Sequence, residues 1–592
     1  MRNLNIIRFT LLEKHFTEPR TFLVMPLDLD PVSLQTLEAL INEGDAEAIV
    51  DFLASFDIVV NIESLSRIIN EIKEVDAFIQ ARSIRPESFE ELEQIRRFIV
   101  TDALIPGRNL IVIPSLRIRE DDERSLNGTF VTILLINEGA IADTGESVGD
   151  NLFTELFLND GAIKFDNGKD FIVAVGGGIS NNGLINTGAQ FDLVSGSATG
   201  VKIVDGVLNT GDIQLSRGND RLIGFAVGVG DIDGIENTNL IMMGKGNDLI
   251  RGDAVGNDAV SAIVNSGIIN TGRGSDAVIG DARGLNLTRI DESLSVAEAG
   301  FVSGILNQSL IATGTGADQI KGDVFAEASA SSIGGDSFGI LNEGGNIQLG
   351  DGNDELLGDS IAIGSLKSAG IASFGIFPKF FDFSLPEKVV IDLGEGNDLV
   401  RGNAGSGTGE QSAGITLIAT NLISKSGNNL IQGNASGGIT NNGIFVDAFS
   451  KIELGEGIDL VTGIAVRGEF NSGITNFGVI KLGKGNDAID ASRGGFNGDG
   501  KTKLGRGDDV ISGFGSGSFN GGGGTDTISL GEGVYEFDSS TKTLTSDGTT
   551  MNLRKVEEIK GFNDMQSLSL IDGEYVIDSS NMLVQTPAFP LL

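Results

Sequence analysis

The chain has 592 residues, of which 85 are glycine, and it contains one histidine but no cysteine or tryptophan. The absence of cysteine excludes a disulfide framework and a thiolate metal site. The formal net charge of −40 at pH 7 argues against nucleic acid and anionic membrane surfaces as partners, and it suits a protein that binds cations.

Residues 1–128 are poor in glycine and predict a small, helix-rich α+β N-terminal domain that caps or docks the rest of the chain. Asn61 is placed to cap one helix, and Ser88 with Glu91 forms a capping box for another. The strings TFLVMPL and NLIVIPSL predict short strands. The first residues are broken by charges and lack the apolar core of a cleaved secretory signal. No apolar run reaches roughly 18 residues, so no membrane insertion is expected.

From residue 129 to 530 the chain repeats. Asp192, Asp220, Asp248 and Asp276 follow one another at a constant spacing, and the spacing varies after them. A second marker is an asparagine at a fixed offset before an aspartate of this series, at Asn159, Asn209, Asn237, Asn265, Asn307 and Asn476. A third marker is an apolar residue two positions after the aspartate or its substitute, at Ile172, Val194, Leu222, Ile250, Val278, Ile320, Leu356, Val400, Ile431, Val461, Ile489, Ile511 and Ile528.

Markers at fixed offsets indicate one structural unit that stacks on its own copies. β-Branched residues in alternation predict a strand after each aspartate, and the N-x-G and G-x-G-x-D strings predict turns. We therefore expect a mainly β protein, a parallel β-helix or β-roll solenoid in which each coil has a short strand, a turn, a second short strand and a variable glycine-rich side. The asparagines are expected to form a ladder at one corner. Residues 531–592 predict a β-rich C-terminal cap.

The G-x-G-x-D strings contain residues that can supply oxygen ligands to a metal ion. In MGKGNDLIR (Met243–Arg251) the glycines permit positive φ, so that the chain can fold tightly with its carbonyl oxygens directed into a small space. The aspartate adds a carboxylate, and the next coil repeats both about 4.8 Å away. Oxygen ligands of this kind suit calcium, which accepts about 6–8 oxygens in flexible geometry, and they disfavour zinc and copper.

MGKGNDLIR, LGEGNDLVR and GGGGTDTIS resemble the RTX, or hemolysin-type calcium-binding, nonapeptide G-G-x-G-x-D-x-U-x. The resemblance covers about residues 160–530 and implies Ca²⁺ as the cofactor. The implied carboxylate ligands are Asp220, Asp248, Asp276, Asp318, Asp354, Asp398, Asp459, Asp487, Asp509 and Asp526. Loop carbonyls would complete the sites, and the glycines named for them are Gly244, Gly246, Gly394, Gly396, Gly483 and Gly485.

The sequence departs from that family in one respect. The family places two nonapeptides in each coil, whereas most coils here carry one, and an N-x-G string takes the other corner. The expected number of ions is therefore halved, and loops with Ala317, Asn429 or Ile458 are candidates for empty sites. The alternative interpretation of G-x-G-N-D is a tight turn in which Asp and Asn bond their own backbone. Stacked carboxylates favour the cation, because like charges so close repel one another unless a cation lies between them.

The resemblance also implies a bacterial protein that is secreted without a cleaved N-terminal signal, by means of an uncleaved secretion signal within residues 531–592. It would lie outside the cell or at its surface. We expect a calcium-binding structural or adhesive protein whose solenoid folds on calcium binding, with other copies of itself or cell-surface polysaccharide as partners. The alternative is the non-catalytic calcium roll of a secreted polysaccharide-active enzyme, or a carbohydrate-binding adhesin. No catalysis is expected, since His15 is the only histidine, Tyr535 and Tyr575 lie beyond the repeats, and H-E-x-x-H and G-x-S-x-G are absent.

Overall fold

The computed structural model describes residues 110–118, 123–126, 129–137, 140–143, 151–165, 167–287, 301–328, 336–363, 367–376, 386–406 and 411–585. The helices predicted within residues 61–105, the strand predicted at TFLVMPL and His15 lie outside these residues. The chain forms two compact units, and the larger one contains Arg117–Leu126, Leu135–Asp150 and Thr154–Leu592. No helix among the described residues has the length and apolar character needed to cross a bilayer.

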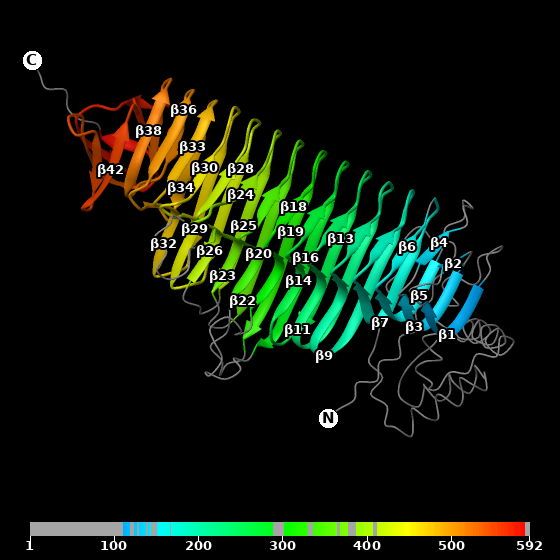
Figure 1. Cartoon of the computed structure of the whole chain (residues 1–592). Helices are drawn as coiled ribbons and strands as arrows, with labels where there is room; N and C mark the ends of the chain where they lie inside the picture. The colour runs from blue at the N-terminus through cyan, green and yellow to red at the C-terminus, as the bar shows by residue number, and fades with distance from the viewer. Residues whose placement is uncertain are drawn as a thin grey trace, which may run out of the picture. The chain divides into compact units, whose positions relative to one another are not determined.

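The larger unit is a stack of coils built from parallel strands, and Figure 1 shows these strands side by side in chain order. Each full coil begins with a short strand of one sheet, which we call sheet B. Its strands are β2 (Glu123–Leu126), β4 (Ala140–Asp143), β6 (Ala162–Lys164), β8 (Leu184–Asn186), β10 (Asp212–Gln214), β12 (Leu240–Met242), β15 (Ile268–Asn270), β18 (Leu310–Ala312), β21 (Asn346–Gln348), β24 (Val389–Asp392), β27 (Thr420–Ile423), β30 (Lys451–Glu453), β33 (Val479–Lys484), β36 (Lys501–Arg506) and β38 (Gly517–Gly523).

The chain then turns through the G-x-G-x-D loop into an outgoing strand of the second sheet, sheet A. The outgoing strands are β7 (Phe171–Asn181), β9 (Leu193–Asn209), β11 (Arg221–Asn237), β13 (Leu249–Gly256), β16 (Ala277–Leu287), β19 (Gln319–Ala328), β22 (Glu355–Ile363), β25 (Leu399–Ser406), β28 (Leu430–Ser436), β31 (Leu460–Val466), β34 (Ala488–Arg493), β37 (Val510–Ser512) and β39 (Thr527–Leu530).

A returning strand of sheet A leads back to the asparagine corner. The separate returning strands are β14 (Val260–Asn265), β17 (Val302–Asn307), β20 (Ser337–Glu343), β23 (Ser368–Phe374), β26 (Gln411–Ile418), β29 (Thr440–Val446), β32 (Phe470–Asn476) and β35 (Phe496–Asn497). In β9 and β11 the outgoing and returning parts form one continuous strand, because each pairs along its length with the other. The remaining strands before the regular coils are β1 (Leu110–Ile118), β3 (Thr129–Asn137) and β5 (Asn151–Asn159); β1 lies where NLIVIPSL predicted a strand.

The predicted apolar column forms the core. All thirteen of its side chains are at most 1 % exposed. Equivalent residues pair in register across coils, as Leu222 with Ile250 and Ile250 with Val278 show. Within one coil, Ile241, Ile250 and Ile263 come from the three successive strands, and all three are fully buried. The mainly β fold with long parallel sheets, which is consistent with a β-helix or β-roll solenoid, is confirmed.

The predicted composition of a coil needs a correction, because its glycine-rich side consists of paired strands. Glycines four residues after the aspartate, such as Gly252 and Gly322, lie against the returning strand. A Cβ on either would be 2.0 Å from a backbone oxygen, that of Ala262 or Gly339. The close contact of the two strands at these glycines separates the main core from a second core. The residues of the second core are Ala198, Val204, Ala226, Ile232, Ala254, Val260, Ala262, Ala282, Val302, Val324, Ala326 and Ala362.

The C-terminal segment changes from parallel to antiparallel pairing. Its strands are β40 (Gly533–Asp538), β41 (Thr543–Ser546), β42 (Thr549–Arg554), β43 (Glu558–Gly561), β44 (Leu568–Ser569), β45 (Gly573–Ile577) and β46 (Leu583–Gln585). Strand β42 adds to sheet B beside β38, and β43 adds to sheet A beside β39. The other pairs, such as β40 with β45, are antiparallel. The open ends of both sheets are thereby covered at this end of the stack.

Candidate metal-binding loops

The asparagine ladder lies at the corner where each returning strand of sheet A leads into the next strand of sheet B. The side-chain amide of each asparagine donates to the side-chain oxygen of the next, with distances between 2.6 and 2.8 Å from Asn137 to Asn342. The predicted ladder is confirmed for Asn159, Asn209, Asn237, Asn265 and Asn307, and the structure adds Asn137, Asn181 and Asn342 to it. Asn476 lies in the same column, but Ser373, Leu417 and Val446 separate it from the ladder.

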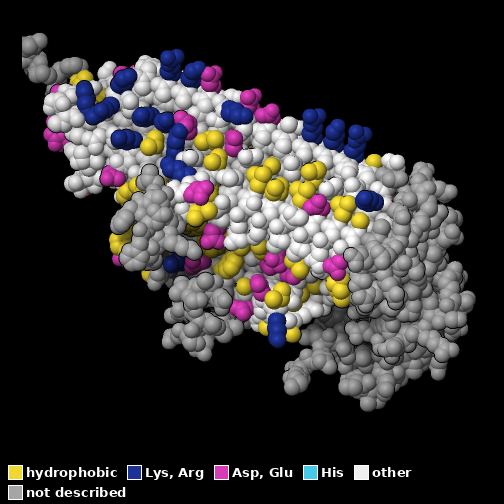
Figure 2. Space-filling view, in the orientation of Figure 1, with side chains coloured by type: hydrophobic (Ala, Val, Ile, Leu, Met, Phe, Trp, Pro, Cys, Tyr) yellow, Lys and Arg dark blue, Asp and Glu magenta, His cyan; other side chains and the backbone are white. Residues whose placement is uncertain are grey.

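The G-x-G-x-D loops stack directly on one another. The residue between the two glycines forms an isolated parallel bridge with its counterpart in the next coil, as Lys245 does with Arg217 and Arg273. The side chains of this column point outward, and Figure 2 shows charged side chains in a line along one long edge of the stack. The aspartate three residues further on is buried.

The loop glycines are required both by conformation and by space. Gly244 has φ +105° and Gly246 has φ +145°. A Cβ on Gly246 would lie 1.3 Å from the carbonyl oxygen of Gly218 in the preceding loop. The other named glycines also have positive φ, at Gly394, Gly396, Gly483 and Gly485. The carbonyl oxygen of Gly244 already accepts a hydrogen bond from the backbone N–H of Arg273, at 3.0 Å.

Asn and Asp of the G-N-D string bond neighbouring coils in opposite directions. Oδ1 of Asp248 accepts from the backbone N–H of Asp220 in the preceding coil, at 2.7 Å. Oδ1 of Asn247 accepts from the backbone N–H of Ser275 in the following coil, at 2.9 Å. The tight-turn interpretation, in which these side chains bond their own backbone, therefore does not describe these loops. Side chains one coil away satisfy the N–H groups at the Asn and Asp positions of the loop, as for Asn247 and Asp248.

All ten aspartates named from the sequence lie in this column, and each is at most 2 % exposed. Each Oδ1 accepts from the backbone N–H of the Asp or Asn one coil earlier. The column starts earlier than those ten, because Asp170 donates its N–H to Asp192, which in turn donates to Asp220. It ends at Glu557 of the C-terminal segment, whose Oε2 accepts from the N–H of Asp526.

The second carboxylate oxygen is the unusual feature of the column. Among the described residues, Oδ2 of Asp192 and of all ten named aspartates is buried and has no hydrogen-bond partner. A buried ionised oxygen without a partner is costly. Burial, together with neighbouring carboxylates of the column, raises the pKa of Asp192 to about 8 and that of Asp220 and Asp318 to about 7. Each Oδ2 is therefore expected to bind either a proton or a cation.

Asn429 shows what surrounds this position, because it occupies the aspartate column with an amide nitrogen in place of the second oxygen. Its Nδ2 donates to the carbonyl oxygen of Gly427 at 3.2 Å, to the hydroxyl of Ser424 at 3.2 Å and to Oδ1 of Asp459 at 3.0 Å. The groups facing Nδ2 are thus acceptors of hydrogen bonds. A pocket of oxygens that accommodates a donor nitrogen at this point is also suited to a positive ion.

A second acidic group was not anticipated from the sequence. Asp205, Asp233 and Glu236 each place a carboxylate oxygen within 4.8 Å of the others. Asp205 and Asp233 are one repeat apart in the sequence, at the same spacing as Asp192 and Asp220, and this spacing was the available signal that they stack. The structure thus contains aspartate ladders and an acidic group that could hold metal ions.

Comparisons with protein-family models, with curated proteins and with solved structures found no match for the chain. Fold and site alone define the class of protein: a parallel, solenoid-like β structure with one ladder of buried asparagines and one of buried aspartates.

Proposed function

We propose that the protein is a calcium-binding, non-catalytic structural or adhesive protein that lies outside the cell or at its surface and whose solenoid folds as calcium binds. The observation that carries the proposal is the column of buried Oδ2 atoms without hydrogen-bond partners among the described residues. At Asn429, which takes the same position, the groups that face it are oxygens. The loop strings support the same conclusion, because they contain the glycines and the aspartate of the RTX nonapeptide that they resemble.

Calcium fits these loops better than other common cations. The ligand atoms on offer are carboxylate and carbonyl oxygens only, which disfavours metals that prefer nitrogen or sulfur. The loops stack at the strand spacing of about 4.8 Å. Two oxygens on opposite sides of a calcium ion are about 4.6–5.2 Å apart, whereas magnesium would bring them to about 4.2 Å. A larger ion between adjacent loops therefore needs the smaller rearrangement of the strands.

A structural role is favoured over an enzymatic one by the position of the two tyrosines. Tyr535 and Tyr575 are 5 % and 1 % exposed, and their hydroxyls donate to the backbone oxygens of Gly531 and Ile571. Both side chains are accounted for by packing in the C-terminal strands. The second candidate is the calcium roll of a secreted polysaccharide-active enzyme or a carbohydrate-binding adhesin, which would use the same loops.

The test exchanges the two residue types that the column itself contains. Asp248→Asn keeps the shape of the side chain and the oxygen that accepts from Asp220, so the coil should fold, yet it should bind one calcium ion fewer in equilibrium dialysis of the full chain. The reciprocal variant Asn429→Asp should bind one more. Lys245→Ala changes the same loop as the first variant without removing a ligand oxygen, and its calcium count should not change. An unaltered count in both column variants would exclude the aspartate ladder as the calcium site.

A further inference from the structure

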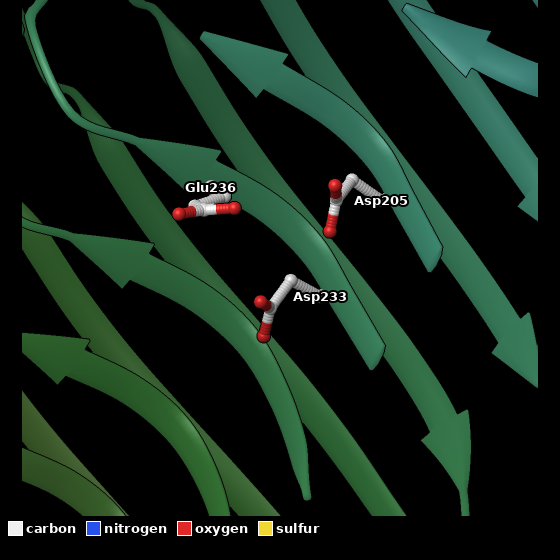
Figure 3. Close-up of side chains that lie close together, drawn as sticks. All are labelled: Asp205, Asp233 and Glu236. Atoms are coloured by element: carbon white, nitrogen blue, oxygen red, sulfur yellow. The ribbon is translucent and has the colours of Figure 1, made fainter. Parts of the chain in front are cut away.

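The group of Asp205, Asp233 and Glu236 lies apart from the G-x-G-x-D loops. Asp205 is on β9, and the other two are on β11 (Figure 3). Asp205 and Asp233 pair directly in the parallel register of these strands. Each precedes its ladder asparagine, Asn209 or Asn237, by four residues. The group is therefore in the returning part of the coil, whereas the loop aspartates precede the outgoing part.

Asp233 and Glu236 converge because the alternation of β11 breaks between them. In a regular strand, residues three positions apart face opposite sides. Here Ile232, Asp233, Gly234 and Ile235 are all buried in succession, and Gly234 lies so close to the next coil that a Cβ would be 2.5 Å from the oxygen of Ala262. Ile232 belongs to the second core. The break turns Asp233 and Glu236 toward the same side of the strand.

The negative charge of these three carboxylates is poorly balanced by hydrogen bonds and ion pairs. Asp233 is 6 % exposed, and among the described residues its Oδ1 and that of Asp205 are buried without a hydrogen-bond partner. None of the ion pairs between described residues includes the three acids. Burial raises the pKa of Asp205 to about 7, with Glu236 and Asp231 adding to the effect, and burial together with neighbouring carboxylates raises the pKa of Asp233 well above its ordinary range.

The fold does not require acids at these positions. In the next two coils the column of Asp233 continues with Ser261 and Ser303, whose hydroxyls are 3.0 Å apart in a hydrogen bond. The column of Glu236 continues with Val264 and then with Leu306, which belongs to a small apolar cluster. A coil of the same geometry is thus built elsewhere from neutral residues, and the three acids need another explanation.

We propose that Asp205, Asp233 and Glu236 bind a single calcium ion at a site separate from the aspartate ladder. Three carboxylates can supply the oxygen-rich, negatively charged coordination that calcium prefers, and ligand oxygens up to 4.8 Å apart match opposite positions around an ion at about 2.3–2.6 Å from each. The bound ion neutralises the mutual repulsion of the acids and ties β9 to β11.

The test counts calcium on the full chain by equilibrium dialysis and elemental analysis. The double variant Asp205→Ser with Asp233→Ser takes the residue that follows in the same column, at Ser261, so that the coil is expected to fold. It should bind one ion fewer than the unchanged protein. The matched control is Asp212→Ser with Asp258→Ser, which removes the same charge from neighbouring coils. Neither residue is among the carboxylates that shift the pKa of the three acids, and the count should be unchanged. A milder variant, Glu236→Gln, should weaken one site at least tenfold.

The outcomes separate this site from the ladder. If the ladder binds no calcium, the unchanged protein should bind one ion and the double variant none; if the ladder binds several, the double variant should lose one and keep the rest. A count that is the same in the unchanged protein and the double variant overturns the proposal, as does an equal loss in the control, which would indicate diffuse attraction by the acidic surface. Circular dichroism and thermal unfolding in millimolar calcium, compared with the unchanged protein, confirm that the double variant is folded.

Discussion

At the scale of single residues, the two oxygens of each column aspartate have different tasks. Oδ1 accepts the N–H of the preceding coil, as Asp276 does from Asp248 at 2.9 Å. This bond links the loops of adjacent coils in register. Oδ2 accepts no hydrogen bond from the described residues. Its state therefore depends on the solution: a proton can occupy it at low pH, and a cation at higher pH.

The raised pKa values predict opposite pH dependences with and without calcium. Without calcium, the folded protein holds protons on column carboxyls whose pKa is about 7 or 8, such as Asp220 and Asp192, while the unfolded chain releases them near pH 4. Because the folded state then binds more protons, its free energy of unfolding falls as pH rises from about 4 to about 8. In chelator the protonated column carboxyls should let the coils fold near pH 5. The unfolding temperature should then drop by more than about 5 °C as pH rises, until the coils no longer fold near pH 8.

With saturating calcium the trend should reverse, because the ion binds the ionised carboxylates and competes with protons for them. Differential scanning calorimetry over pH 5–8, in chelator and in calcium, measures both trends. The Asp192→Asn variant, which cannot titrate at the most perturbed position, should show a shallower fall in chelator. A fall of the same slope in both solutions would show that calcium does not occupy the column.

At the scale of the structural elements, glycine marks places where one backbone touches another. The last loop provides a matched pair in adjacent positions. Gly524 has φ +138°, and a Cβ there would lie 2.0 Å from the oxygen of Gly507. At Gly523 a Cβ would meet nothing within 4 Å, and the same column holds Lys484 and Arg506 in the preceding coils.

We predict that Gly524→Ala lowers the free energy of unfolding by about 2 kcal/mol or more, since it combines backbone strain with a contact that cannot relax without separating two loops. Gly523→Ala should change it by less than about 0.5 kcal/mol. Chemical denaturation of the two variants in calcium provides the measurement. Equal effects would mean that the loops do not stack as closely as these distances indicate.

Stacking also explains which features could be predicted from the sequence. Residues at equal positions of successive coils become neighbours, so the constant spacing of the repeat predicted the apolar column, the asparagine ladder and the aspartate column without further geometry. Gly252 and its equivalents stand four residues after the aspartate in most coils, and the sequence places them on a variable side because glycine normally marks turns. Their packing against a returning strand depends on the coil's cross-section. The convergence of Asp233 and Glu236 likewise depends on a break in one strand, which periodicity does not reveal.

At the scale of the whole larger unit, each coil contacts mainly the coils before and after it. Strand β13, for example, pairs with β11 on one side and β16 on the other. In such an array, stability is the sum of the coils' own free energies and those of their interfaces. An ion between two loops belongs to an interface, because its ligands come from both coils. Calcium should therefore strengthen the coupling between coils as well as each coil itself.

This coupling predicts that calcium protects the coils cooperatively against proteolysis. At a calcium concentration about ten times the dissociation constant, each independent site adds about 1.4 kcal/mol, so ten such sites would add about 14 kcal/mol, comparable to the stability of a typical domain. Without calcium, the charge of −40 and the unpartnered carboxylates oppose folding. The full chain should therefore be cleaved throughout residues 160–530 in chelator and protected in millimolar calcium, with a Hill coefficient well above one. Magnesium at equal concentration should protect much less, which controls for charge screening. If protection follows a simple hyperbola, or the coils resist protease in chelator, their apolar cores alone suffice for folding, and calcium binds to a solenoid that has already formed.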